Sequence, residues 1–398
     1  MRPTRVLLIS PVPELDPSSG DVVYTNSLLG HPPANVQYET YPKAIEAGRL
    51  RELARRDDFE SAAGTDRLFA LGRIGRERLI NSLRRRGILF REPFRYFKVE
   101  PHTYDLVHCH VFSAAFVDLD APLVMSSACA IEDLYRGARQ WPEWRVGLAS
   151  RADATLARGL RVQHTSHAMP AASAVVCFTE TFRDELLRRG SVDAVRLHVA
   201  PCFVDPGPRS PARDRPRTIG FVASDFDAKG GPTVLRAFEL VRNERPDAEL
   251  IVIGSPPHGT RTQLEARGIK WHPRLRRREL LEEYMPLFDV FAYPTEFDGL
   301  PLTILEVMAR GIPIATSDYQ AMPEIVGHGR AGSVTQQRDS EALARALLFL
   351  LDPVNNSKAR RQAADWFDTH YTPGVAVSKL ARAYDAAMRF HTYEPTLR

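Results

Sequence analysis

The chain has 398 residues, of which 44% are hydrophobic and 26% are charged. This composition supplies enough apolar material for two or three globular domains, and it excludes collagen-like, coiled-coil and broadly disordered chains. The 53 basic and 49 acidic residues leave a net charge of only +4. A charge this small does not require a nucleic acid or another polyanion as partner.

The cysteines and the N-terminal sequence indicate in which cellular compartment the protein is expected. The cysteines at positions 109, 129, 177 and 202 form no CxxC pair, which favours reduced, buried thiols over a zinc or redox motif. The apolar run Val6–Ile9 is too short for the core of a signal peptide. No uncharged apolar run approaches the roughly 18–20 residues that span a bilayer. We therefore expect a cytoplasmic protein without a membrane-spanning anchor.

Short aliphatic and β-branched runs alternate with helical patterns along the whole chain, which is typical of parallel sheets covered on both faces. In the first half, the predicted strands are residues 5–10, 105–109, 122–126, 174–178 and 196–200. In the second half, they are residues 218–222, 249–253, 289–293 and 313–316.

The two series of strands are separated by a proline-rich segment. Residues 201–217 contain five prolines and no periodic pattern, as expected of a linker. This predicts an α/β fold with two Rossmann-like, doubly wound parallel-sheet domains that face a cleft, an N-terminal one over 1–200 and a C-terminal one over 218–373. We expect residues 374–398 to form a closing helix that packs back across the domains. Ligands of such folds bind at the carboxyl ends of the strands.

The loop after the first strand argues against a dinucleotide cofactor. The sequence after Ser10, PVPELDPSSGDVVYTN, lacks G-x-G-x-x-G and has the single Gly20. Hydride transfer is therefore disfavoured, because the pyrophosphate of such a cofactor needs that glycine-rich turn. Gly20 before a helix suits a close approach of a ligand to the backbone, but it also fits an ordinary loop glycine.

The most informative segment begins where a predicted strand ends at Tyr293. Pro301 favours a helix start, and Gly311 is a suitable cap after a helix over 302–310. The amides of residues 302–304 then point back into the turn, an arrangement that binds phosphate.

Two acids accompany this helix. Glu306 lies about one turn into it and can face the same way as the amides, where a carboxylate suits sugar hydroxyls such as a ribose diol. Asp298 stands just before the helix. For a generic helix, a capping Asp298 and a solvated Glu306 are the simpler interpretation.

The same stretch resembles the nucleotide-sugar segment of family-4 retaining glycosyltransferases of the GT-B fold. Asp298 and Glu306 fall on the family's E-x7-E pattern, followed by VMARGIPIATS and by the PEIV motif at 323–326. The resemblance is dense over 218–335 and looser before. It implies transfer of a hexose-type sugar from a nucleoside diphosphate sugar to a glycan, lipid-linked or small-molecule acceptor, with retention and without a metal or other cofactor.

Carried over by position, the resemblance assigns roles around the helix. It implies that Glu306 holds the ribose and that Asp298, one methylene shorter than the family's Glu, contacts the hydroxyls of the donor sugar. It implies that Gly299, Leu302 and Thr303 complete the nucleotide-sugar site.

The segment over 218–238, TIGFVASDFDAKGGPTVLRAF, resembles the family's strand, loop and helix that present an Arg and a Lys to the diphosphate. Lys229 matches the Lys, whereas the Arg position is Ser224, so one charge is missing. A Lys followed by two glycines at a helix start also suits phosphate on physical grounds. By the same resemblance, Gly20 lies beside the diphosphate.

The strand DLVHCH over 105–110 resembles the family's strand that ends in H-x-H at the cleft. His108 and His110 point the same way on a strand, and His110 is nearer the carboxyl end. The resemblance implies that His110 contacts the donor sugar or the reacting centre. No third ligand for a metal is visible in the sequence.

Residues 71–100 hold nine Arg or Lys and three Glu, with aromatic residues interleaved. A basic amphipathic stretch can lie on an anionic membrane, and we expect it there to meet a lipid-linked or anionic acceptor at the inner face. A solvated helix face fits the same pattern, and both interpretations stay open.

Two other functions stay open as well. A sugar-nucleotide epimerase or hydrolase of the same fold would need no acceptor. A non-catalytic nucleotide-sugar-binding protein would fit Ser224 and Asp298 in place of the family's Arg and Glu.

Overall fold

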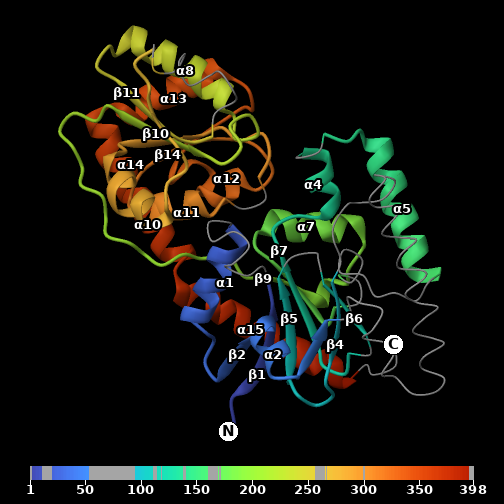
Figure 1. Ribbon diagram of the computed structural model, residues 1–398. Helices are drawn as coiled ribbons and strands as arrows, with labels where there is room; N and C mark the ends of the chain where they lie inside the picture. The colour runs from blue at the N-terminus through green and yellow to red at the C-terminus, as the bar shows by residue number, and fades with distance from the viewer. Residues whose placement is uncertain are drawn as a thin grey trace.

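The computed structural model folds into two α/β lobes joined by an extended segment (Figure 1). It describes residues 2–10, 20–52, 95–110, 114–117, 119–137, 140–159, 169, 172–255, 265, 267–298 and 301–393. Within these residues, no helix is both long and apolar enough to cross a membrane.

The first lobe is built on a six-stranded sheet in the order β2-β1-β5-β7-β8-β9, in which every neighbouring pair is parallel. Its strands are β1 (Thr4–Ile9), β2 (Val36–Thr40), β5 (Leu106–His110), β7 (Leu123–Ser127), β8 (Ala174–Cys177) and β9 (Leu197–Val199). A small sheet in the order β3-β4-β6 lies beside it, with β3 (Leu50–Glu52), β4 (Arg95–Val99) and β6 (Ala114–Val117).

Both faces of the large sheet are buried, which explains the unbroken apolar runs in the sequence. Val6 and Leu8 of β1 belong to one core cluster and Leu7 and Ile9 to another, because successive side chains point to opposite faces. The described helices of this lobe are α1 (Gly20–Gly30), α2 (Tyr41–Glu46), α4 (Ile131–Gly137), α5 (Glu143–Gly159) and α7 (Glu180–Arg189), with a 3-10 turn at Ala194–Arg196.

The second lobe has a parallel six-stranded sheet in the order β12-β11-β10-β13-β14-β15. Its strands are β10 (Thr218–Ala223), β11 (Glu249–Gly254), β12 (Lys270–His272), β13 (Val290–Tyr293), β14 (Ile314–Ser317) and β15 (Gly332–Thr335). The strand order reverses between β10 and β13, and ligands of doubly wound sheets bind outside the carboxyl ends at such a point.

The helices of the second lobe cover its sheet on both sides (Figure 1). They are α8 (Gly231–Glu244), α10 (Arg277–Glu279), α11 (Leu302–Ala309), α12 (Met322–Ile325), α13 (Ser340–Leu351) and α14 (Pro353–His370). The described residues of this lobe also form a π-helical turn (Leu280–Tyr284) and two 3-10 turns (Met285–Leu287 and Gly327–Gly329).

The proline-rich segment between the lobes has neither helix nor strand over 200–217. It is nevertheless packed against the second lobe. The buried Asp289 carboxylate accepts hydrogen bonds from the backbone of Arg217 at 2.8 Å and Thr218 at 3.0 Å, and from the Arg213 guanidinium at 2.9 Å. The segment is therefore anchored to the second lobe by its polar groups.

The last helix, α15 (Pro373–Tyr393), crosses from the second lobe to the first and contacts β7, β8 and β9 (Figure 1). Its Tyr384 hydroxyl lies 2.6 Å from Nδ1 of His108 and 2.8 Å from the Tyr38 hydroxyl. The C-terminal helix is thus part of the core of the N-terminal lobe.

The predicted fold class is confirmed, and each of the nine predicted strands is present with its ends within one residue of the expectation. Sequence reasoning missed the short strands β2, β12 and β15 and the small β3-β4-β6 sheet. Three-residue strands such as β12 carry too few residues to show a periodic pattern.

Candidate functional site

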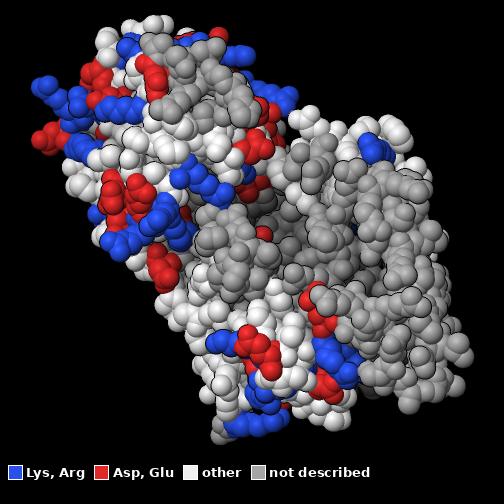
Figure 2. All heavy atoms as spheres, in the orientation of Figure 1, with Lys and Arg blue, Asp and Glu red and all other residues white. Residues whose placement is uncertain are grey.

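A cavity of about 310 Å³ lies at the carboxyl ends of β10, β11 and β13. Gly20 and Val23 of α1 also line it, so its wall comes from both lobes. Acidic and basic side chains are interspersed over the described part of the face in Figure 2. The cavity is at the lower end of the size range of small-molecule sites.

Lys229 is presented by the loop between β10 and α8. Gly230, the next residue, has φ of +79°, and a Cβ there would lie 2.1 Å from the carbonyl oxygen of Pro294, so only glycine fits. This close approach brings Lys229 beside the turn after β13, where its ammonium donates to the Phe297 carbonyl at 3.0 Å. Lys229 also forms an ion pair with Asp298.

Asp298 is held from two sides. Besides the ion pair with Lys229, its Oδ2 accepts a hydrogen bond from the Tyr293 hydroxyl at 2.6 Å. Burial, together with the charge of Asp298, raises the pKa of Tyr293 well above its usual value, so the phenol remains a donor. The capping role considered for Asp298 is wrong, because the N-cap of α11 is Pro301 and no side chain caps it.

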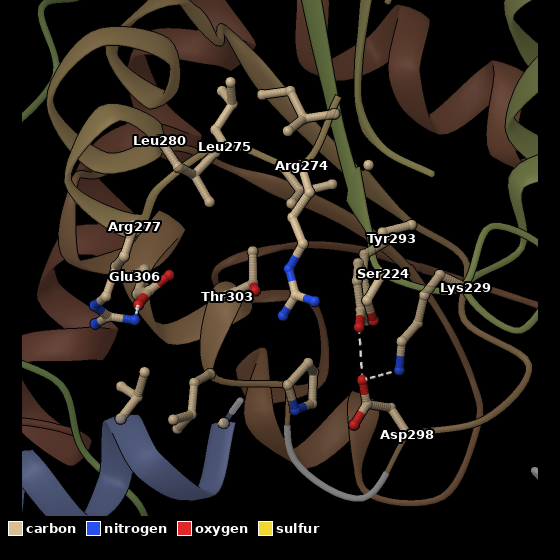
Figure 3. A pocket seen from close by; sticks show the side chains of 18 residues that line it. Ser224, Lys229, Arg274, Leu275, Arg277, Leu280, Tyr293, Asp298, Thr303 and Glu306 are labelled. Atoms are coloured by element: carbon tan, nitrogen blue, oxygen red, sulfur yellow. Dashed lines mark hydrogen bonds and ion pairs between the residues drawn. The ribbon is translucent and has the colours of Figure 1, made fainter. Parts of the chain in front are cut away.

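Glu306 lies on α11 and is only 3% exposed, so the expectation of a solvated residue is wrong. It forms an ion pair with Arg277, which follows β12. Burial raises the pKa of its carboxyl group by more than the neighbouring Arg277 and Arg310 lower it, so the net shift is upward. Figure 3 shows the two ion pairs, Lys229 with Asp298 and Arg277 with Glu306, on opposite sides of the cavity.

His110 ends β5 and is 5% exposed. Its Nδ1 lies 3.0 Å from the Ser126 hydroxyl, and its Nε2 lies 3.3 Å from the Asp21 carboxylate at the start of α1. Burial raises the pKa of Asp21, but the hydrogen bond and charge of His110 lower it by more, so the net shift is downward. His110 does not line the cavity itself, and it contacts the residue that follows Gly20.

His108 is fully buried and, like His110, is not among the residues that line the cavity. Its Nε2 shares the Ser126 hydroxyl at 2.8 Å, and its Nδ1 faces Tyr384 of α15. Burial, together with the charge of His110, lowers the pKa of His108 to about 3. His108 is therefore a neutral structural residue near neutral pH.

The structure places most of the site residues expected from the sequence around this one cavity. Gly20, Ser224, Lys229, Asp298, Leu302, Thr303 and Glu306 all line it. A Cβ on Gly20 would make only an ordinary contact with Leu302 at 3.9 Å, so space alone does not require glycine there. Gly299 lies outside the described residues, as do residues 53–94, which include most of the basic stretch over 71–100.

Sequence reasoning missed the wall that follows β12. Arg274, Leu275, Arg277 and Leu280 line the cavity from this side. The signal was the basic run RLRRREL over 274–280, which reads as a solvated helix start when its strand is not recognised. Among the described residues, no three His, Cys, Asp or Glu side chains come together as a metal site would require.

Two doubly wound lobes with a cavity between them define the GT-B class of proteins, and comparisons with known proteins agree. Residues 216–353 match the family model described as glycosyl transferases group 1. The D-inositol 3-phosphate glycosyltransferase of Streptomyces avermitilis is 25% identical over 328 residues, 73% of this chain and 67% of that one. The MMP alpha-(1->4)-mannosyltransferase of Mycolicibacterium hassiacum is 31% identical over 212 residues, about half of either chain.

Solved structures share the fold over nearly the whole chain. HepE of Anabaena, solved in complex with UDP and glucose, has a TM-score of 0.61 at 13% identity over 96% of this chain and 100% of its own. Sucrose-phosphate synthase of Thermosynechococcus elongatus has a TM-score of 0.60 at 14% identity over 96% and 98%. The resemblance seen in the sequence is confirmed: residues 216–353 match the group 1 glycosyltransferases, and the chain has the GT-B fold.

Proposed function

We propose that this glycosyltransferase moves a hexose-type sugar from a nucleoside diphosphate sugar to a glycan, lipid-linked or small-molecule acceptor, with retention at the anomeric carbon. One observation carries the proposal. Lys229, the N-terminal end of α11 and Glu306 line a single cavity at the point where the strand order of the second sheet reverses. A cation, free amides and a carboxylate are the groups that a diphosphate and its ribose need.

The departing nucleoside diphosphate gains negative charge as its bond to the sugar breaks. Donors aimed at this charge stabilise the transition state more than the bound substrate, and they therefore raise the rate. Lys229 and the amides of Leu302 and Thr303 at the start of α11 supply such donors from two elements of the second lobe. The Ile304 amide, expected to be a third, donates instead to the Pro301 carbonyl at 3.0 Å. In this proposal Lys229 and the two amides take the place of a metal ion, and no other cofactor is needed.

Glu306 is proposed to bind the ribose. Its carboxylate is inside the cavity wall and the Arg277 guanidinium beside it favours the ionised form, which accepts two hydroxyl donors at once. Leu275 and Leu280 provide an apolar wall near Arg277 on which a base can pack. The complex of HepE with UDP and glucose supports a nucleotide sugar as the ligand class.

The first lobe is proposed to bind the acceptor, and Asp298 and His110 to contact the donor sugar. His110 and Asp21 lie at the edge of the first lobe that faces the cavity, next to Gly20. Contact of residues 71–100 with the inner face of a membrane is part of the proposal for a lipid-linked acceptor.

A two-stage experiment tests the function. The melting temperature is first measured with UDP, GDP, ADP and TDP and with their sugar conjugates, because a ligand that binds only the folded state raises it. The conjugate that binds is then incubated with an acceptor panel, and the anomeric configuration of the product is read by NMR.

The controls separate the alternatives. An epimer or free sugar formed at full rate from the donor alone indicates an epimerase or hydrolase. Binding without turnover over the whole acceptor panel indicates a binding protein. An inverted anomeric centre contradicts retention.

A further inference from the structure

A phenylalanine ring of the second lobe lies directly against a glycine of the first. Phe297 belongs to the turn after β13, and Gly137 ends α4, on the side of the first lobe that is turned toward the second (Figure 1). A Cβ at Gly137 would lie 2.6 Å from Cγ of the Phe297 ring and closer still to Cδ2, a separation that side chains do not adopt. The ring therefore occupies the space that any other residue at position 137 would fill.

The contact is supported in both lobes. In the second lobe, the Phe297 ring also packs against Tyr319, with the ring centroids 6.3 Å apart and the planes at 62°. In the first lobe, α4 shares a small apolar core with α5, and the Arg189 guanidinium of α7 lies 3.2 Å from the Asp133 carboxylate of α4. Gly137 thus ends a helix that is fixed to its neighbours, and the ring has little freedom beside it.

The backbone of Phe297 is bonded to the loop that carries Lys229. The Phe297 amide donates to the Ala228 carbonyl at 3.2 Å, and the Glu296 amide donates to the same oxygen at 2.9 Å. The Phe297 carbonyl accepts from the Lys229 ammonium at 3.0 Å. The next residue, Asp298, forms the ion pair with Lys229. A shift of Phe297 therefore moves this ion pair, because the peptide groups on both sides of its Cα are engaged with the loop.

We infer that Phe297 is a positioning residue for sugar transfer: seated against Gly137, it makes the placement of Lys229 and Asp298 depend on the contact between the lobes. This inference rests on the function proposed for those two residues and deepens it. The glycine supports the ring only while the lobes are together. The ammonium and the carboxylate are then held in place when the first lobe covers the site and excludes water, which favours transfer to the acceptor.

The test adds one methyl group to either of two helical glycines. Gly137→Ala overlaps the Phe297 ring. Gly147→Ala on α5 is the matched control, because a Cβ there would have no heavy atom of another described segment within 4 Å. Hydrogen exchange is followed at the amides of residues 296 and 297, kcat and KM are measured with the sugar donor, and the melting temperature shows that each variant is folded.

We expect Gly137→Ala to speed exchange at both amides, although the methyl group is on the other lobe. We expect kcat to fall by about tenfold and KM for the sugar donor to change by less than about threefold, since an overpacked contact opens while the nucleotide site of the second lobe persists. Gly147→Ala should match the wild type. In a Phe297→Leu background the shorter side chain leaves room for the methyl group, and Gly137→Ala should then change kcat by less than about twofold.

Wild-type exchange and kcat in Gly137→Ala overturn the inference. An equally large loss of kcat in the Phe297→Leu background overturns it too, because the damage then lies within α4. If Gly137→Ala does not fold, Phe297→Ala answers the same question, since it removes a half-buried ring, and unchanged exchange at Glu296 with unchanged kcat overturns the inference.

Failure of the wild type to transfer sugar from any donor overturns the proposed function instead. The exchange measurement needs no substrate, so it still shows whether a methyl group at position 137 disturbs the turn at Phe297. The two failures are thereby distinguished.

Discussion

Lys229 and Asp298, which stand 69 positions apart, form an ion pair inside the cavity, and the same carboxylate oxygen accepts the Tyr293 hydroxyl at 2.6 Å. The side chains are only 15% and 18% exposed. The ammonium proposed to meet the diphosphate is therefore held in place by the acid proposed to meet the sugar. Binding of a nucleotide sugar must share Lys229 between an internal carboxylate and a phosphate.

Replacing Lys229 by Ala is expected to lower kcat by about a hundredfold or more, equivalent to about 2.7 kcal/mol of transition-state stabilisation. Lys270→Ala is the matched control, because Lys270 is an exposed lysine that pairs with Glu249 away from the cavity. Steady-state kinetics of both variants decide the point. Near-normal turnover in the Lys229 variant would show that the phosphate charge is stabilised by other groups.

Asp298→Asn is expected to separate nucleotide binding from transfer. The amide has nearly the same shape and still accepts from Tyr293, but it leaves the Lys229 charge to the phosphate. The affinity for a free nucleoside diphosphate should equal or exceed that of the wild type, while turnover of the sugar donor should fall by about tenfold or more. Calorimetry measures the affinity for the diphosphate and steady-state kinetics measure the turnover, both on the same preparation. Weaker diphosphate binding by the variant would contradict the idea that Asp298 competes with the phosphate for Lys229.

Glu306→Gln is expected to weaken nucleoside diphosphate binding by about tenfold, because a neutral amide is a poorer acceptor for two ribose hydroxyls. A sharper measurement compares the affinities of the wild type and the variant for the normal nucleotide and for its 2′,3′-dideoxy analogue. The wild type should lose affinity for this analogue, whereas the Glu306 variant should bind it and the normal nucleotide about equally. Equal discrimination in both proteins would mean that the ribose contacts another residue.

The buried His108 is expected to make the free energy of unfolding depend on pH. Its pKa is about 3 in the folded protein, below the usual 6.5, so the unfolded chain binds the proton first as pH falls. The stabilising contribution is present above pH 6.5 and is lost between pH 6.5 and about 3, at up to about 1.4 kcal/mol per pH unit for this group.

The measurement is urea unfolding of the wild type and of His108→Asn at intervals across this range. The variant replaces the imidazole, which titrates, by an amide, which does not. The imidazole contacts Ser126 and Tyr384 in the wild type. We expect its free energy of unfolding to fall less steeply below pH 6.5. Parallel curves would show that His108 does not carry this part of the acid sensitivity.

Glu324, in the PEIV motif, is expected to stabilise the contact between the two lobes. From α12 of the second lobe its carboxylate accepts the backbone N–H of Glu180 at 2.7 Å and of Thr181 at 2.8 Å, at the start of α7 in the first lobe. The Thr181 hydroxyl donates to it at 2.6 Å. An acid at a helix N-terminus satisfies free amides and interacts favourably with the helix dipole.

Glu324→Ala should therefore speed hydrogen exchange at the amides of residues 180 and 181 and increase the radius of gyration in solution scattering, since the lobes separate more readily. Glu341→Ala, at an exposed position on α13, serves as the control. Unchanged exchange at both amides would contradict a contact between the lobes in solution.

The sequence by itself determined the two parallel sheets and the main chemical groups of the site. Strands buried on both faces carry unbroken apolar runs, so β1, β5, β10 and β13 were visible as local patterns. Loops that follow such strands meet at one edge of a sheet, and the family motifs placed Lys229, Asp298 and Glu306 in those loops or just beyond them.

Only the tertiary structure decided which groups face one another. Arg277 forms an ion pair with Glu306, and Arg274 lines the cavity because the strand β12, which the sequence pattern did not reveal, ends beside it. Glu324 accepts a hydrogen bond from the backbone of the other lobe. Charged side chains look alike in sequence whether they are solvated or paired. Their partners lie on other strands or the other lobe, so their burial and their pairing follow from how the sheets and lobes pack.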